Sequence, residues 1–155
     1  MSDAALPLID EHAVVADGDA QQARDALVHV IGRSFADPRR GRVAAVLGCE
    51  DTAIAGPPFP AVGATVPGFH VADSEAPRVL ALEGRHRFSR YALTFRLTPD
   101  AEGTRIGAET RAAFPGIAGK LYRAAVIGTR GHVLAVRSML RGIERRVAHD
   151  RARPG

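Results

Sequence analysis

Residues 91–148 read YALTFRLTPDAEGTRIGAETRAAFPGIAGKLYRAAVIGTRGHVLAVRSMLRGIERRVA and decide the fold, because two alternating segments lead directly into one long segment with helical spacing. In the first part apolar and polar residues alternate, which is typical of β-strands with one buried face. In the second part apolar residues recur every three or four positions, which predicts one helix from about Ile117 to Ala148. A helix of this length after a twisted antiparallel sheet indicates that the helix closes over a space beside the sheet.

The two alternating segments fit a single hairpin register in which each inward side chain faces another. The predicted opposite pairs are Leu97–Ile106, Phe95–Ala108, Leu93–Thr110 and Thr94–Glu109. The other face carries polar residues, and we expect Glu109 and Arg111 to form a surface charge ladder there. This pattern predicts an antiparallel sheet with one covered face.

The predicted helix has an apolar stripe interrupted by Tyr122, Thr129 and His132. The opposite face is basic, and its residues are Lys120, Arg123, Arg130, Arg137, Arg141 and Arg145. We expect this basic face to be solvated and expect no nucleic-acid partner, because no aromatic residues interleave with the arginines as stacking platforms. Gly128 and Gly131 each cost about 1 kcal/mol of helix propensity, and their small size suits a close backbone approach or a bend.

The preceding residues predict a strand, two helices and further strands. Asp19 and Gln22 form a capping-box pattern at the start of the first helix. The predicted segments are a strand Leu8–Asp17, a helix ending near Phe35, a helix Arg40–Leu47 ended by Gly48, a short strand Thr52–Ala55, and strands Ala64–Ala72, Arg78–Glu83, Arg85 or Tyr91 to Thr98, and Thr104–Phe114. These segments predict an α+β fold in which a curved antiparallel sheet wraps around a long C-terminal helix.

Length and composition indicate one domain over residues 1–155, with flexible ends at 1–7 and 149–155. A single cysteine, Cys49, excludes an intramolecular disulfide. No apolar run approaches the roughly 18 residues that cross a bilayer, so no stable membrane insertion is expected. The N-terminus lacks signal-peptide features, which favours the cytoplasm. The six histidines show no zinc-ligand spacing, so we expect neither a metal nor a cofactor. We expect the protein to be a monomer or a homodimer.

The order of elements resembles the START-like helix-grip superfamily, and more narrowly its polyketide cyclase/dehydrase and lipid-transport group (SRPBCC proteins). The residues that carry the resemblance are Gly103-Thr104-Arg105-Ile106, Ala108-Glu109-Thr110-Arg111 and the segment from Leu121 through Ile143. The resemblance implies a cavity between sheet and helix. Members of the group bind lipids, sterols, aromatic polyketides or hormones, and some catalyse cyclisation, aromatisation or dehydration.

Such a cavity is mostly apolar, with a few polar groups that orient the ligand. The candidate ligand-binding residues are His86, Tyr91, Leu93, Phe95, Thr110, Tyr122, Thr129, His132 and Val136. Histidine suits proton transfer near neutral pH, so His86 and His132 are the candidates for general acid/base catalysis. A turn at Gly84 would place Arg87 inward, whereas a straight strand to Phe88 would place His86 inward.

The leading hypothesis is a soluble binding protein for a small hydrophobic molecule. One alternative is an enzyme of the polyketide cyclase, aromatase or dehydratase type that uses histidines and tyrosines of the cavity. A second alternative is an interaction module whose arginine-rich helix face binds an anionic partner.

Overall fold

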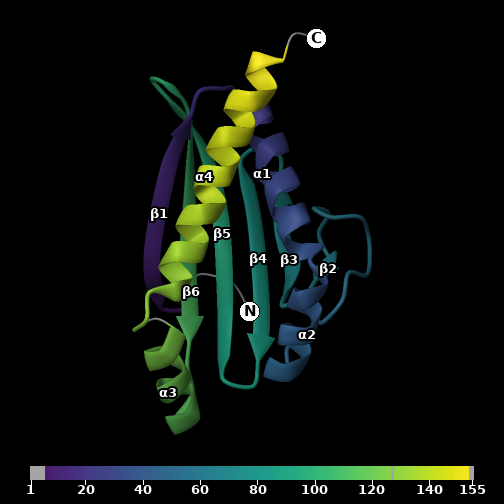
Figure 1. The fold of residues 1–155 in the computed structure, drawn as a ribbon, viewed down its shortest axis with the longest axis vertical. Coiled ribbons are helices and arrows are strands. Elements are labelled where there is room, and N and C mark those ends of the chain that lie inside the picture. Colours follow the sequence, from purple (N-terminus) through teal and green to yellow (C-terminus); the bar gives the residue numbers. More distant parts are fainter. Residues whose placement is uncertain (1–5, 127, 154–155) are drawn as a thin grey trace.

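The computed structural model describes residues 6–126 and 128–153 and shows an α+β fold with one antiparallel sheet in the order β1-β6-β5-β4-β3-β2 (Figure 1). The strands are β1 (Leu8–Ala16), β2 (Thr65–Val66), β3 (Phe69–Glu75), β4 (Val79–His86), β5 (Ser89–Asp100) and β6 (Gly103–Ala113). The helices are α1 (Ala20–Phe35), α2 (Pro38–Leu47), α3 (Gly116–Val126) and α4 (Gly131–Ala152). The predicted fold class, a sheet packed against a long C-terminal helix, is confirmed.

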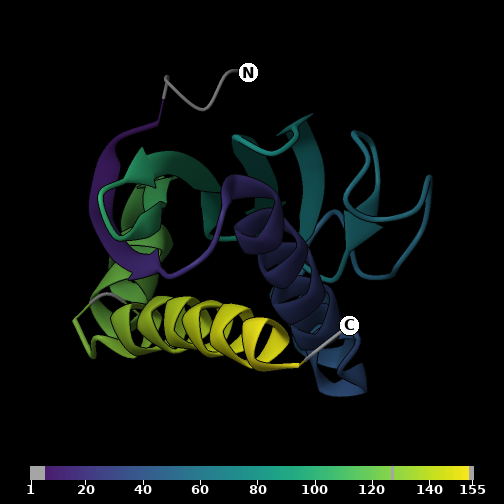
Figure 2. The ribbon, with the colours of Figure 1, turned by 90° about the horizontal axis from the view of Figure 1, so that it is seen from above.

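Helices α1 and α4 lie side by side on one face of the curved sheet (Figure 2). The buried residues of α4 recur every three or four positions, which places them on one face of the helix. They are Val136, Leu140, Ile143 and Val147. Their partners in the core include Leu27 and Ile31 of α1 and Phe95 and Ile106 of the sheet. The core therefore lies between the sheet and these two helices.

The predicted hairpin register between β5 and β6 is confirmed at all four pairs, from Leu97–Ile106 to Leu93–Thr110 and Thr94–Glu109. On the outer face, the Arg111 Nε donates to Glu109 Oε1 at 2.6 Å, so the predicted charge ladder is present. Thr94 lies on the same face but is buried, because its short side chain sits between cross-strand neighbours. Alternation of residue types was enough to determine this register.

The predicted single helix from Ile117 to Ala148 is wrong, because α3 ends at Val126 and α4 begins at Gly131. In the break, the Thr129 hydroxyl donates to the Ala125 carbonyl at 2.6 Å, which offers that carbonyl a partner other than a backbone N–H. Arg130 has a left-handed φ of 57°, which an α-helix does not allow. The apolar spacing continues across the break, so periodicity could not reveal it.

Two further predictions need correction. The strand predicted at Ala64–Ala72 is divided into β2 and β3 by a turn at Pro67-Gly68, where Gly68 has a φ of 89°. The strand predicted at Thr52–Ala55 is reduced to a single bridge between Ala55 and Thr65. Strand pairing needs a partner at the right distance, and composition alone does not supply one.

The predicted helix boundaries before β2 are close to those observed. Asp19 and Gln22 form the capping box of α1, and Gly48 ends α2 in a left-handed conformation. Helix α2 begins at Pro38, two positions before the predicted start, because the Asp37 side chain accepts a hydrogen bond from the Arg39 N–H at 2.9 Å. The predicted domain span and flexible ends stay predictions. Residues 1–5 and 154–155 of these ends lie outside the described part, and residues 149–152 belong to α4.

Candidate functional site

A cavity of about 390 Å³ lies between α2, the end of the sheet where β4 meets β5, α3 and the start of α4. Most of the side chains that line it are apolar. Seven of the nine predicted ligand-binding residues line it, namely His86, Tyr91, Leu93, Thr110, Tyr122, His132 and Val136. Arg39 and Arg40 of α2 are exposed at its opening.

The other two predicted residues do not line this cavity. Phe95 is fully buried in the core beneath the helices. Thr129 is exposed in the break between α3 and α4, so its predicted place on the inner stripe is wrong. The predicted stripe assumes one continuous helix, whereas Thr129 lies in the exposed segment between α3 and α4.

His86 faces the cavity because β4 runs straight through Gly84 and turns only at Arg87-Phe88. Arg87 is exposed. The Phe88 N–H donates to His86 Nδ1 at 3.0 Å, so the neutral ring carries its hydrogen on Nε2, which donates to Ser89 Oγ at 3.1 Å. Burial lowers the pKa of His86. The imidazole is therefore neutral at neutral pH, with both nitrogens already bound to the protein.

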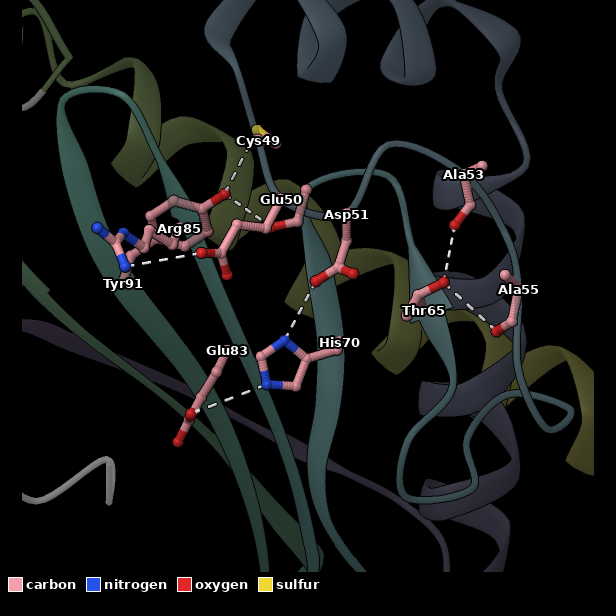
Figure 3. Close-up of polar contacts among 11 residues, drawn as sticks. Cys49, Glu50, Asp51, Ala53, Ala55, Thr65, His70, Glu83, Arg85 and Tyr91 are labelled. Carbon is pink, nitrogen blue, oxygen red and sulfur yellow. Dashed lines mark hydrogen bonds and ion pairs between the residues drawn. The ribbon is translucent and has the colours of Figure 1, made fainter.

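Tyr91 joins two neighbouring parts of the wall through its hydroxyl (Figure 3). This hydroxyl donates to the Gly68 carbonyl at 2.7 Å, and Cys49 Sγ lies 3.8 Å from the same oxygen. Since the hydroxyl hydrogen is directed at Gly68, the thiol is the donor to Tyr91. Burial raises the pKa of Cys49, of Tyr91 and of Tyr122. All three groups are uncharged at neutral pH.

We expect iodoacetamide to alkylate Cys49 more slowly in the native protein than in urea at every pH up to the ordinary thiol pKa. The thiolate is the reactive form, and a raised pKa shifts its formation to higher pH. Mass spectrometry over a pH series, in native and unfolded protein, measures both rates. Equal rates at each pH would contradict the buried environment of the thiol.

The segment after α2 is fixed to the sheet by polar contacts (Figure 3). Asp51 Oδ2 lies 3.2 Å from His70 Nδ1 on β3, and the Asp51 carbonyl accepts from the Gly68 N–H at 2.7 Å. The Glu50 N–H donates to the Arg85 carbonyl at 3.0 Å. These bonds hold Cys49 and the end of α2 beside the cavity.

A polar group lies where β1, β6 and α4 meet. The Thr110 side-chain oxygen is buried and has no hydrogen-bond partner within the described part of the chain, although the residue lines the cavity. Asp10, which pairs with Thr110 across the strands, has one carboxylate oxygen 3.3 Å from His132 Nε2 and the other 3.4 Å from His12 Nε2. One end of the cavity is thus able to hydrogen-bond a ligand.

Sequence reasoning missed Asp10 and His12. Asp10, His12 and Val14 are each two positions apart on β1, so their side chains lie on the same face of the sheet. Because Val14 packs against the core, this alternation was the signal that could have placed Asp10 and His12 inward. It also missed the contribution of α2, because a short helix with apolar residues on several sides does not reveal which face is covered.

Among the described residues, no group of histidine, cysteine and acidic side chains is arranged to hold a metal ion. Within the same residues no helix combines the length and apolar character needed to cross a bilayer.

The chain matches no family model and no curated protein. It is similar to solved structures of a protein from Nitrosospira multiformis (TM-score 0.58, 12% identity, 95% of this chain and 100% of that chain) and a protein from Mesorhizobium loti (0.55, 16%, 96% and 100%). A third, from Arthrobacter aurescens, has a TM-score of 0.52 at 15% identity, over 92% and 91% of the two chains. The likeness shows the fold alone. That fold is consistent with the helix-grip arrangement.

Proposed function

We propose that this chain binds a small hydrophobic molecule that carries one hydrogen-bonding group, such as a hydroxyl or carbonyl. The observation that carries this proposal is the Thr110 hydroxyl, which is only 8% exposed, lines a largely apolar cavity and has no hydrogen-bond partner among the described residues. A buried polar group without a partner costs about 1–3 kcal/mol. A ligand that supplies the missing hydrogen bond would recover part of this free energy, because its own polar group gives up a bond to water.

The electrostatic character of the wall supports an uncharged, apolar ligand body. His86, Cys49, Tyr91 and Tyr122 are all neutral at neutral pH, for the reasons given above. An apolar molecule therefore displaces water without removing any of these groups from a favourable ionised state. The volume of about 390 Å³ lies within the range of about 300–1,000 Å³ that holds small ligands.

A second candidate function is acid–base catalysis on the bound molecule by His132. The Asp10 carboxylate lies 3.3 Å from His132 Nε2 and would orient the ring toward a bound molecule. His86 suits this role poorly, because Phe88 and Ser89 occupy both of its nitrogens. Incubation of the protein with each bound compound, followed by mass spectrometry of the compound, distinguishes turnover from binding.

Two experiments test whether the cavity binds such molecules. Native mass spectrometry with solvent extraction detects a compound that co-purifies with the protein. Thermal shifts are then measured with fatty acids, sterols and polycyclic phenols. Naphthol and naphthalene then form a matched pair that differs by one hydroxyl. We expect the native protein to prefer naphthol by about 2- to 10-fold, the effect of one net hydrogen bond. In Thr110→Val this preference should vanish.

The same substitution, which should remove the preference for naphthol, should stabilise the protein when no ligand is bound. Thr110→Val removes an unpartnered hydroxyl and should raise the free energy of unfolding by about 1 kcal/mol. Thr98→Val, at an exposed position of β5, is the matched control and should change neither quantity. If no compound binds or shifts the melting temperature, or if the naphthol preference survives Thr110→Val, the proposal is wrong.

A further inference from the structure

One end of the molecule combines exposed apolar side chains with basic ones. Helix α2, the turn between β4 and β5, and α3 all lie at this end (Figure 1). The turn touches both helices: the Arg87 N–H donates to the Leu47 carbonyl at 3.3 Å, and the Phe88 ring stacks on Tyr122 at 5.5 Å. The three segments therefore form one continuous surface, here called the basal surface.

Helix α3 presents its apolar residues to solvent. Gly119 is buried, and a side chain there would meet the Phe114 backbone at 2.7 Å, so this face of α3 lies against the body of the protein. Ile117 and Leu121, one turn apart, are 80% and 69% exposed. On α2, Val43 and Val46 are also exposed large apolar residues. Exposed apolar side chains gathered at one end of a protein, with cations beside them, are typical of a site that contacts a protein or a membrane.

The charge of the basal surface indicates what covers it. Its exposed cations are Arg39, Arg40 and Arg42 of α2, Arg87 of the turn, and Lys120 and Arg123 of α3. Helices α2 and α3 contain no acidic residue. Apolar side chains flanked by lysine and arginine are the combination that binds the interface of an anionic bilayer, where apolar groups enter the acyl boundary and cations meet lipid phosphates.

We propose that the basal surface docks on the surface of an anionic phospholipid bilayer, without crossing it. Val43, Tyr122 and Val126 belong to the helices of this surface and also line the cavity. Docking would therefore place the cavity opening at the lipid interface. The proposal does not depend on what the cavity binds, because vesicle binding is measured with the protein alone.

Co-sedimentation of the full chain with vesicles tests this proposal. We expect binding to vesicles of phosphatidylcholine mixed with phosphatidylglycerol, and at least about tenfold weaker binding to phosphatidylcholine alone. The double variant Ile117→Asp/Leu121→Asp should lose at least about tenfold in affinity for the mixed vesicles. The control Ile54→Asp/Val62→Asp removes two exposed apolar residues of the α2–β2 segment and should bind as the native protein does.

Charge reversal gives a second comparison. Lys120→Glu/Arg123→Glu should weaken binding several-fold more than Arg137→Glu/Arg141→Glu, which makes the same charge change on the exposed face of α4. Circular dichroism and light scattering confirm that each variant is folded and give its oligomeric state. The proposal would be overturned if the native protein did not bind the mixed vesicles, or if the two members of either pair had equal effects. It would also be overturned if Ile117→Asp/Leu121→Asp changed a dimer to a monomer, because the surface would then be a protein contact.

Discussion

Gly84→Ala should lower the free energy of unfolding by about 3 kcal/mol, the upper part of the range for overpacking a core. A methyl group at this position would lie 2.2 Å from the Gly68 carbonyl oxygen and 2.4 Å from the Tyr91 ring. The Gly68 oxygen belongs to backbone, and the ring is held by its hydroxyl bond to that same oxygen. Neither group can move alone, so the Gly68 backbone and the Tyr91 ring must shift together or their hydrogen bond must break.

Urea denaturation measures this loss, and Gly107→Ala is its control on the same sheet. A methyl group at Gly107 would meet only Glu11 Oε1 at 3.6 Å and the Arg96 carbonyl at 3.9 Å, which are ordinary contacts. We expect this control to remain within about 1 kcal/mol of the native protein. Displacement of Tyr91 in Gly84→Ala should also accelerate alkylation of Cys49. Equal stabilities of the two variants would show that Tyr91 does not occupy the space over Gly84.

Leu140→Ala should cost about 2–5 kcal/mol, as expected for truncation of a fully buried leucine. Leu140 is 1% exposed and lies in the core that α4 forms with α1 and the sheet. The loss combines the transfer free energy of the removed methyl and methylene groups with the cavity that they leave. Chemical denaturation of the purified variant gives the value directly.

Leu134→Ala makes the same chemical change on the same helix at a residue that is 63% exposed. It should alter the free energy of unfolding by no more than about 0.5 kcal/mol. A comparable loss in both variants would mean that α4 packs on a different face from the one described.

Much of the fold could be predicted because its signals are local. The β5–β6 register follows from alternation within 91–112, and the capping box of α1 follows from two residues three positions apart. The break between α3 and α4 was not found because the apolar period continues through it. The Thr129 hydroxyl bond and the left-handed φ of Arg130 accompany the break, and both belong to backbone geometry that periodicity does not describe.

The site was partly predictable for the same reason. The inward residues of β5 and β6 and the inner face of the C-terminal segment supplied six of the seven cavity residues, and a straight β4 supplied the seventh, His86, rather than Arg87. The contribution of α2 could not be predicted, because its place over the cavity depends on contacts such as the one between Asp51, which follows α2, and His70 of β3. No periodicity or motif in the sequence relates these two segments.

By itself, the sequence determined the class of fold, the order of its elements and the side chains that face inward, because hydrophobic periodicity is a property of consecutive residues. Only the tertiary structure decided that the Thr110 hydroxyl has no partner within residues 6–126 and 128–153, and that Asp10 contacts His132 across 122 positions of chain. It alone also brought the exposed apolar residues of α2 and α3 to one end. Whether a polar group is satisfied, and whether an apolar one is covered, depends on distances between elements that packing sets and local sequence does not encode.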